Sequence, residues 1–279
     1  MRVPYRKMHG TGNIILIVDR RAEDSPPPDA QTLRELGVDA TGPGFDQLMW
    51  LTPSSDKTSV ASYRVFNADG SEVEQCGNGV RCVARYLADT DDVGREFTLQ
   101  SPAGPIAARV DADGLVTVSM GAPIFEPDRI PFAAEVAADT YVLAAENEQL
   151  TISAVSMGNP HAVLQVADVS TAAVSEIGPL LEYHERFPER TNVGFMQING
   201  RQNISLRVHE RGVGETAACG TGACAAVVSG QRLGLLDEDV SVQLPGGQVV
   251  VSWRGGAAPV WLKGNAELIN EGMLDLGKL

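Results

Sequence analysis

Short apolar segments recur along the whole chain, and they follow two patterns. Residues 14–19 form an aliphatic run with almost no polar interruption, which predicts a buried strand. Residues 58–66 alternate between two sets of side chains, which predicts a strand with two unlike faces. Similar patterns predict further strands at 48–51, 96–100, 104–110, 115–120, 191–198, 204–208, 240–244, 248–253 and 259–262, and a strand pair around a Gly-Asn-Pro turn at 152–164.

Four segments predict helices. Two are short, at residues 30–36 and 174–181, and two begin directly after Cys76 and Cys219. Strands therefore outnumber helices, and Asp-Gly turns such as Asp113-Gly114 are typical of hairpins. We expect an α+β fold with mostly antiparallel strand pairing.

One sequence unit occurs twice in the chain. The turn Cys76-Gly77-Asn78-Gly79 recurs 143 positions later as Cys219-Gly220-Thr221-Gly222. The same offset relates Glu72 to Glu215, Pro102 to Pro245, Gly104 to Gly247 and Gly121 to Gly264. This repetition predicts two pseudo-symmetric domains, each a curved, barrel- or roll-like sheet around a central helix, with the active site in the cleft between them. The predicted domains are 1–121, joined by the tail 265–279, and 122–264.

Composition is ordinary for a globular protein, but the charge is not. Of the 279 residues, 43% are apolar and 21% are charged, and the net charge is −14. This charge argues against nucleic acid and anionic membranes as partners. The start of the sequence lacks the apolar segment of a secretory signal, and four cysteines without one suggest a reducing compartment, so we expect a cytoplasmic protein.

The two Cys-Gly-x-Gly turns are the candidate chemistry. A cysteine at the start of a helix lies near unpaired backbone N–H groups and the positive end of the helix dipole, which favour a thiolate. The glycines would let the backbone approach a bound anion such as a carboxylate. A cysteine in this position is also often a small buried apolar residue, so the pattern alone leaves both interpretations open.

Two thiols that share a cleft could form a disulfide, bind a metal, or act as an acid and a base. The four histidines, at positions 9, 161, 184 and 209, form no ligand-spaced cluster, so we expect no metal. The glycine-rich turns lack the Gly-Lys-Ser/Thr ending of a phosphate-binding loop, and no lysine has a pyridoxal-type context. Direct proton transfer at carbon remains, with a thiolate removing a proton and a thiol returning one.

Several segments together resemble one family, the diaminopimelate epimerases. The resemblance covers the whole chain in order and is carried by Met8-His9-Gly10-Thr11-Gly12-Asn13, Phe66-Asn67-Ala68-Asp69-Gly70-Ser71-Glu72, Cys76-Gly77-Asn78-Gly79-Val80-Arg81-Cys82, Ser156-Met157-Gly158-Asn159-Pro160-His161, Arg190-Thr191-Asn192-Val193, Glu210-Arg211-Gly212-Val213-Gly214-Glu215-Thr216 and Cys219-Gly220-Thr221-Gly222. It implies a cofactor-independent epimerase that interconverts LL- and meso-2,6-diaminopimelate in bacterial lysine and cell-wall synthesis, usually as a homodimer.

The resemblance also implies roles for individual residues. Cys76 and Cys219 would be the acid and base pair, and His161 and Glu210 would tune the pKa values of the thiols. The substrate would be contacted by Asn13, Gln47, Asn67, Gly77, Asn78, Asn159, Asn192, Glu210, Arg211, Gly220 and Thr221. Arg211 suits a carboxylate, because its guanidinium can donate two parallel hydrogen bonds.

The sequence departs from the family in two places. Ile14-Ile15 stands where members often have Asp-Phe, and Thr41 stands where many have a cysteine. Both changes concern local packing near the first predicted strands.

Two other functions remain open. The first is a racemase of another small amino or imino acid, in the manner of the proline racemases, which also use two cysteines. The second is a non-catalytic amino-acid-binding protein in which the cysteines are structural. A disulfide between Cys76 and Cys219 that switches the enzyme off is a further hypothesis. Cys82 and Cys224 fall inside the helices and are expected in the core.

Overall fold

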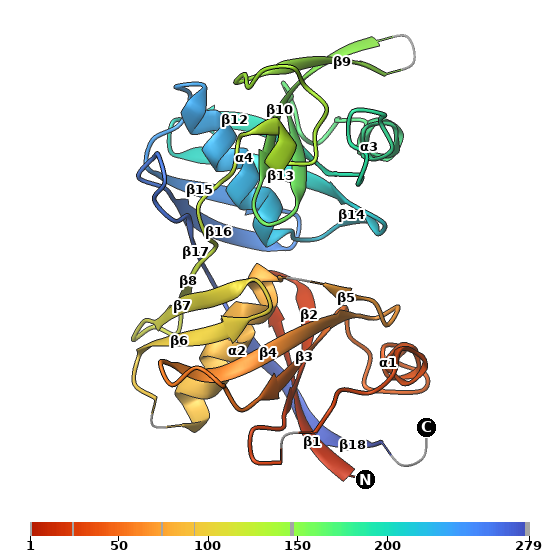
Figure 1. The fold of residues 1–279 in the computed structure, drawn as a ribbon, viewed down its shortest axis with the longest axis vertical. Coiled ribbons are helices and arrows are strands. Elements are labelled where there is room, and N and C mark those ends of the chain that lie inside the picture. The colour runs from red at the N-terminus through yellow and green to blue at the C-terminus, as the bar shows by residue number, and fades with distance from the viewer. Residues whose placement is uncertain (1, 24, 74, 92, 146–147, 277–279) are drawn as a thin grey trace. The chain divides into compact units, whose positions relative to one another are not determined.

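The computed structural model describes residues 2–23, 25–73, 75–91, 93–145 and 148–276. The chain divides into two compact units (Figure 1). Unit 1 comprises Met1–Ser119 and Lys263–Leu279, and unit 2 comprises Met120–Leu262. In the described residues, no helix has the length and apolar content needed to cross a membrane.

Unit 1 is a curved mixed sheet with a helix packed inside it. Its helices are α1 (Ala30–Leu36) and α2 (Gly77–Thr90), and its strands are β1 (Arg2–Gly10), β2 (Asn13–Asp19), β3 (Gln47–Thr52), β4 (Ser59–Asn67), β5 (Glu72–Val73), β6 (Glu96–Ser101), β7 (Gly104–Val110), β8 (Val116–Ser119) and β18 (Glu267–Asp275). The strands pair in the order β18-β1-β2-β3-β4-β6-β7-β8, and β5 also pairs with β4. Only β2–β3 and β4–β6 are parallel among these pairs of described strands.

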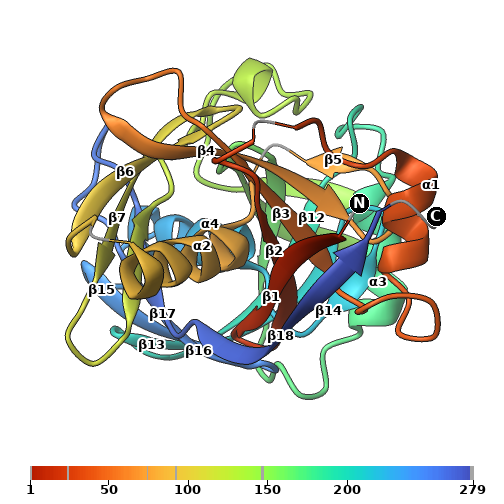
Figure 2. The same ribbon diagram turned by 90° about the horizontal axis from the view of Figure 1, so that it is seen from below.

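The strands of unit 1 curve around α2 (Figure 2). The helix contacts β1, β2, β3, β7 and β8. Its residues Val80, Val83, Ala84 and Leu87 are all fully buried, and their spacing places them on one helix face. The first turn of α2 is buried as well, so its start is held firmly by the sheet.

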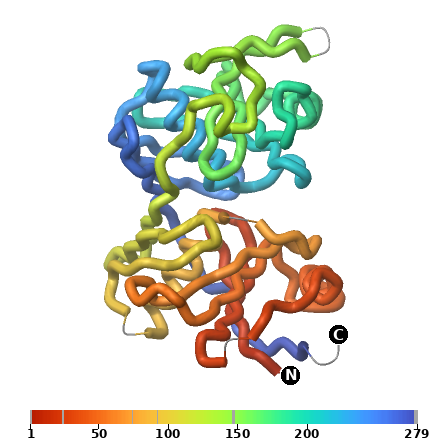
Figure 3. Tube along the Cα trace, viewed as in Figure 1, coloured from red at the N-terminus to blue at the C-terminus, as the bar shows by residue number. Residues whose placement is uncertain are grey.

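The C-terminal segment belongs to unit 1. Strand β18 pairs antiparallel with β1 from Arg2↔Asp275 to His9↔Glu267, with a register shift after Lys7 (Figure 3). In this way the last described strand lies beside the first.

Unit 2 has the same plan. Its helices are η1 (Pro127–Arg129), α3 (Val174–Glu182) and α4 (Gly220–Arg232), and its strands are β9 (Tyr141–Ala145), β10 (Glu148–Ser156), β11 (Pro160–Gln165), β12 (Asn192–Gly200), β13 (Asn203–Glu210), β14 (Gly214–Thr216), β15 (Asp239–Leu244) and β16 (Gly247–Ser252); β17 (Trp261–Gly264) crosses the boundary of the units. The pairing order is β9-β10-β11-β12-β13-β15-β16, with β14 on β13. Helix α4 contacts β10, β11, β12, β13 and β16.

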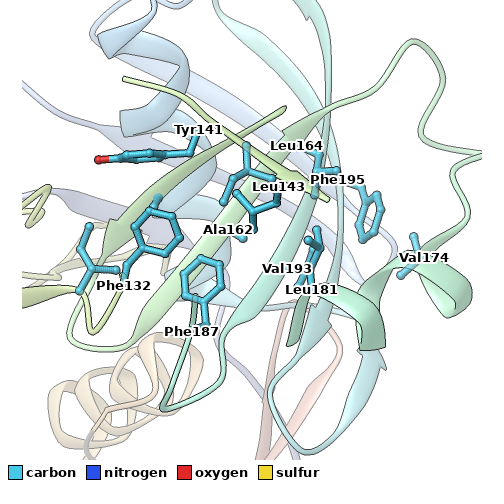
Figure 4. Packing of buried hydrophobic residues seen from close by; sticks show 13 residues of the cluster. Phe132, Tyr141, Leu143, Ala162, Leu164, Val174, Leu181, Phe187, Val193 and Phe195 are labelled. Atoms are coloured by element: carbon cyan, nitrogen blue, oxygen red, sulfur yellow. The ribbon is translucent and has the colours of Figure 1, made fainter. Parts of the chain in front are cut away.

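One cluster of buried apolar residues in unit 2 includes residues of its sheet, of α3 and of the segment that contains Phe132 (Figure 4). The ring of Phe132 lies 4.7 Å from that of Tyr141 and 4.6 Å from that of Phe187. Leu181 of α3 and Phe195 of β12 belong to the same cluster. It anchors the C-terminal end of α3, which supports part of the candidate site.

Several strand pairings of unit 1 recur at equivalent positions in unit 2. Val65↔Val73 becomes Val208↔Thr216, Glu96↔Arg109 becomes Asp239↔Ser252, and Ser101↔Gly104 becomes Leu244↔Gly247. Each of these residues is 143 positions from its counterpart. The predicted α+β fold with two similar units from an internal repeat is therefore confirmed.

Five strands were not predicted from the sequence, namely β1, β5, β9, β14 and β18. Residues 5–13 looked like a glycine-punctuated turn, but most of them form β1, and only Thr11 and Gly12 form the turn. Strands β9 and β18 also lacked a clear pattern. β1 and β18 carry mainly polar or partly exposed side chains, and they pair with each other and, for β1, with β2. Hydrophobic periodicity cannot reveal strands of that kind.

Candidate active site

Cys76 caps helix α2 of unit 1. Its backbone is extended, and its sulfur accepts a hydrogen bond from the Gly79 amide at 3.2 Å. The thiol is partly exposed and lies 3.9 Å from the side-chain oxygen of Asn13. The capping bond and the helix dipole both favour negative charge on this sulfur.

The last glycine of each Cys-Gly-x-Gly turn has a packing role. A Cβ at Gly79 would come within 2.6 Å of the Met49 sulfur, and one at Gly222 within 3.0 Å of Val208 Cγ2. Met49 and Val208 belong to the sheets that surround the helices. The glycines therefore let each helix start pack directly against its sheet.

Three amide side chains of unit 1 are held by hydrogen bonds, and one of them, Asn13, contacts Cys76. Asn13 donates to Asp46 at 3.3 Å, which turns its oxygen toward the thiol. Gln47 donates to Asn67 at 3.1 Å, and Asn67 donates to the Ser71 hydroxyl at 3.1 Å. The buried Gln47 Oε1 accepts no hydrogen bond within the described ranges. It is an acceptor that a bound ammonium group could use.

The side chain of Asn78 is occupied inside unit 1. It is 3% exposed and accepts from the Arg81 guanidinium at 2.9 Å. Arg81 also donates to the Thr11 hydroxyl at 2.9 Å, which fixes the turn between β1 and β2. Any substrate contact of Asn78 would therefore use its backbone amide.

Cys219 occupies the equivalent position at the start of α4, but it lies in a different environment. It is only 4% exposed. Burial raises the pKa of its thiol well above the ordinary value, and the neighbouring Glu210 carboxylate raises it further. The Thr221 hydroxyl, 3.6 Å away, and the Gly222 amide act in the opposite direction. Cys219 is therefore a protonated thiol that donates to Glu210.

Glu210 is held at the end of β13. The Thr216 hydroxyl on β14 donates a short hydrogen bond to its carboxylate. Because one carboxylate thus contacts both Thr216 and Cys219, it can follow the charge on the sulfur. The role of Thr216 was not evident from the sequence.

His161 is a buried neutral ring. It is 1% exposed, and its Nε2 lies 3.0 Å from Asn159 Oδ1. Burial lowers its pKa to about 3, and the positive charge of Arg211 contributes to the shift. Its Nδ1 is buried and has no hydrogen-bond partner in the part of the chain that the structure describes. At neutral pH the ring can donate or accept a hydrogen bond, but it carries no charge.

This lowered pKa predicts acid sensitivity. The unfolded chain binds a proton on His161 near its ordinary pKa of 6.5, whereas the folded protein resists protonation down to about pH 3. Stability from this group is present above pH 6.5 and is lost as the pH falls toward 3. We expect His161→Gln to lose fewer degrees of Tm than the wild type between pH 7 and pH 4 by differential scanning fluorimetry. His184 is partly exposed, and His184→Gln should lose as many degrees of Tm as the wild type. An equal decrease of Tm between pH 7 and pH 4 in all three proteins would contradict the prediction.

The other predicted site residues of unit 2 form hydrogen bonds within that unit. They are Asn159, Asn192 and Arg211. Asn159 donates to the Thr221 hydroxyl at 3.5 Å. Asn192 donates to the Pro160 carbonyl at 2.9 Å and accepts from the Arg211 amide at 3.1 Å. The side chain of Asn192 therefore holds the backbone of the site. The exposed Arg211 guanidinium donates to the Glu189 carbonyl at 3.1 Å.

A buried contact between Glu182 and His209 supports the turn that carries Arg211. Glu182, at the end of α3, lies 2.8 Å from His209 Nε2 and accepts from the Gly212 amide at 2.9 Å. Glu182 is 3% exposed and His209 is 7% exposed. The two residues are far apart in sequence and belong to no recognisable spacing, so the sequence did not reveal the pair.

Each unit thus gathers its own set of predicted residues. Unit 1 brings Asn13, Gln47 and Asn67 near the Cys76 end of α2, and unit 2 brings His161, Asn159, Thr221 and Glu210 near Cys219. None of the four cysteines is in a disulfide. Cys82 and Cys224 are fully buried, as expected for core residues. No group of three or more His, Cys, Asp or Glu side chains among the described residues could hold a metal ion.

Solved structures with the same fold span almost the whole chain. A probable proline racemase from Agrobacterium radiobacter K84, with bound carbonate, is 15% identical, with a TM-score of 0.73 over 99% of this chain and 94% of that one. A hydroxyproline epimerase from Agrobacterium vitis, with bound trans-4-OH-L-proline, is also 15% identical, with a TM-score of 0.70 over 98% and 91%. Methylitaconate-delta-isomerase is 16% identical, with a TM-score of 0.62 over 98% and 95%. At these identities the likeness establishes the fold.

The sequence comparison defines the class of protein. The family model described as diaminopimelate epimerase matches residues 5–126 and 153–269, which include all of the predicted site residues. The protein is an isomerase of the racemase and epimerase class. The chain belongs to the diaminopimelate epimerase family.

Proposed function

We propose that the protein interconverts LL- and meso-2,6-diaminopimelate without a cofactor, using Cys76 and Cys219 as the two proton-transfer groups. The observation that carries this proposal is that a cysteine starts the equivalent helix in both halves of an internal repeat. Membership of the diaminopimelate epimerase family supports the substrate.

The reaction moves one proton at each face of the α-carbon. A thiolate takes the α-proton, so that a C–H bond breaks and an S–H bond forms. The other thiol then gives its proton to the opposite face of the carbanion and becomes a thiolate. Backbone amides at the helix starts would stabilise the α-carboxylate as negative charge develops on it. No proton is consumed, and the two sulfurs exchange protonation states.

The environments of the sulfurs support unlike starting states. Cys76 accepts a hydrogen bond from the Gly79 amide at the start of α2, which stabilises a thiolate, whereas the Asn13 side-chain oxygen accepts from the protonated thiol. Cys219 donates to Glu210 and is held as a thiol. A turnover that begins with Cys76 as base leaves a thiolate beside the Glu210 carboxylate. That arrangement is electrostatically unfavourable, so return of a proton to Cys219 is favoured.

The second amino-acid head group of diaminopimelate would bind to polar side chains that do not take part in proton transfer. Arg211 suits its carboxylate, and the side-chain oxygens of Gln47 and Asn67 suit an ammonium group. Proline lacks this second head group, so these residues favour diaminopimelate over the proline-type alternative.

A panel of substrates tests the choice between diaminopimelate and proline. We expect the reduced protein to convert LL-diaminopimelate to the meso isomer by chiral chromatography and to leave L-proline and trans-4-hydroxy-L-proline unchanged; the opposite pattern would favour the proline-type alternative.

The proposed role of Arg211 gives a prediction for Glu182. Glu182→Ala removes the carboxylate that binds the Gly212 amide and His209, leaving buried polar groups unpaired. The loss of such a hydrogen bond changes an equilibrium constant by about 10-fold. We therefore expect the KM for diaminopimelate to rise about 10-fold and kcat to change less. The control is Glu176→Ala in the first turn of the same helix. An unchanged KM in a folded Glu182→Ala protein would be evidence against this role.

We also propose that the enzyme is a cytoplasmic homodimer. The mechanism needs two reduced thiols, which a reducing compartment maintains. Light scattering on the purified protein should give twice the 29.6 kDa of one chain, and a monomer mass would refute the dimer.

A further inference from the structure

Two ion pairs outside the catalytic groups occupy equivalent positions in the two units. In unit 1, Arg64 Nε and Nη2 bind Glu72 Oε1 and Oε2 at 2.7 and 2.6 Å. In unit 2, the same atoms of Arg207 bind Glu215 at 2.6 and 2.8 Å. Both members are separated from their counterparts by 143 positions. We call them the hairpin ion pairs.

Each hairpin ion pair joins a long strand to the short strand that precedes a catalytic cysteine. Arg64 is on β4 and Glu72 on β5, which is only two residues long (Figure 1). Arg207 is on β13 and Glu215 on β14, which is three residues long. In both units the glutamate comes four residues before the cysteine. Such short strands have few ladder hydrogen bonds to fix their position, so a side-chain link matters more for them.

The geometry of these pairs is more specific than that of an ordinary surface ion pair. Both are bidentate, with two parallel hydrogen bonds between a planar guanidinium and a carboxylate. Their side chains are partly exposed, between 24% and 45%, and pairs of this exposure add little to global stability. Their recurrence at the same two positions is therefore better explained by what they position locally.

We propose that the hairpin ion pairs are positioning residues that hold the approach to Cys76 and Cys219, so that each sulfur stays at the start of its helix. This inference rests on the proposed function for its catalytic consequence. Both pairs act through the backbone of the short strands β5 and β14, which precede the helix starts.

The two pairs differ in what else they touch. The Arg64 guanidinium also lies 5.0 Å from the centre of the Phe66 ring. Arg207 instead donates to the carbonyls of Val169 and Ala172 at 3.0 and 3.2 Å. These carbonyls belong to the segment before α3, so Arg207 joins three segments. We therefore expect a larger effect from loss of the unit 2 pair.

The test uses the two thiols as controls for each other. Glu72→Gln and Glu215→Gln keep the shape of the side chain but remove its charge. Glu238→Gln removes the charge of an exposed pair with Arg254 elsewhere in unit 2 and is the matched control. Peptide mass spectrometry after iodoacetamide treatment measures the alkylation rate of each cysteine, and kcat and KM are measured with diaminopimelate.

We expect the alkylation rate to fall at Cys76 in one variant and to rise at Cys219 in the other. Glu72→Gln should slow alkylation of Cys76 because the sulfur loses its amide bond at the helix start, while the Cys219 rate stays unchanged. Glu215→Gln should speed alkylation of Cys219 because its burial is relaxed, while the Cys76 rate stays unchanged. Glu72→Gln should lose about 10-fold in kcat and Glu215→Gln should lose more, since a displacement of 1 Å costs about 10²-fold, and KM should change less than kcat in both.

Three results would decide the inference. Alkylation rates and kcat that match those of Glu238→Gln would overturn it. Alkylation of the buried Cys82 or Cys224 would show that a variant is unfolded. In that case the positioning role is tested with Arg64→Lys and Arg207→Lys, because they keep the positive charge and lose the bidentate contact. Lysine variants with wild-type alkylation and kcat would also overturn it. Altered alkylation without any diaminopimelate turnover in the wild type would support the positioning role and refute the proposed substrate.

Discussion

Replacing Cys76 or Cys219, the two proposed proton-transfer groups, by serine should lower kcat for epimerisation by about 10³-fold, because positioned acid–base groups contribute about 10²- to 10⁴-fold to rates. Cys76→Ser and Cys219→Ser remove one of the two proton-transfer groups, and a hydroxyl is far less acidic than a thiol. The loss should occur in both reaction directions, since each turnover uses both sulfurs. Time courses followed by chiral chromatography, starting from each isomer, measure it.

The matched control for this prediction is Cys224→Ala. It removes a thiol from the same helix as Cys219, but from the buried core, so its kcat should stay within a few-fold of the wild type. If one of the serine variants kept wild-type kcat while folded, the two-thiol mechanism would be wrong for that cysteine.

Glu210→Gln should lower kcat/KM by about 10- to 100-fold, the cost of losing one charged hydrogen bond. The same change should make Cys219 more acidic. Glu210 raises the pKa of this thiol because a neighbouring negative charge opposes the thiolate. Without that charge, the pH dependence of Cys219 alkylation should move to lower pH. Iodoacetamide rates between pH 6 and pH 10, resolved by peptide, measure the shift.

Glu185→Gln is the control for the Glu210 experiment. Glu185 is an exposed carboxylate of the same unit, and its loss should change neither kcat/KM nor the alkylation profile. A Glu210→Gln profile shifted to higher pH would contradict the assignment of Glu210 as the group that keeps Cys219 protonated.

The repeat produces similar backbones but unlike chemistry at the two sulfurs. Asn67 and Glu210 are the last residues of the equivalent strands β4 and β13 and lie 143 positions apart, so an amide stands in unit 1 where a carboxylate stands in unit 2. Cys76 is partly exposed, whereas Cys219 is buried. These differences are compatible with a reaction whose two half-steps need an acid and a base of different strength.

Much of the fold could be predicted because the repeat and the strand patterns agree. The offset of 143 residues that relates positions 72–104 to positions 215–247 in the sequence also relates the strand pairings of the two units. Strands β1 and β18 could not be predicted, because most of their side chains are polar or partly exposed, although Val3 and Leu274 belong to the core of unit 1. In the N-terminal part of each unit the offset changes: Leu48 and Val193 are equivalent through their partners Phe66 and His209, so one offset cannot align the whole chain.

The candidate site was predictable where it lies in local motifs. The positions of Cys76 and Cys219 at helix starts followed from the glycines and small residues after them. The Glu182–His209 contact joins residues distant in sequence, so no local pattern marks it. Asn192 was expected to contact substrate, a role that stays a prediction, but its side chain binds the backbone at Pro160 and Arg211.

Proton exchange with solvent tests the central claim most directly. LL-diaminopimelate is incubated with the reduced enzyme in D₂O and followed by proton NMR. The account predicts that the α-proton signal decreases as the meso isomer appears, and that Cys76→Ser and Cys219→Ser abolish this coupled change. An unchanged α-proton signal with active, reduced wild-type protein would contradict the account and leave an amino-acid-binding protein or an enzyme for another substrate.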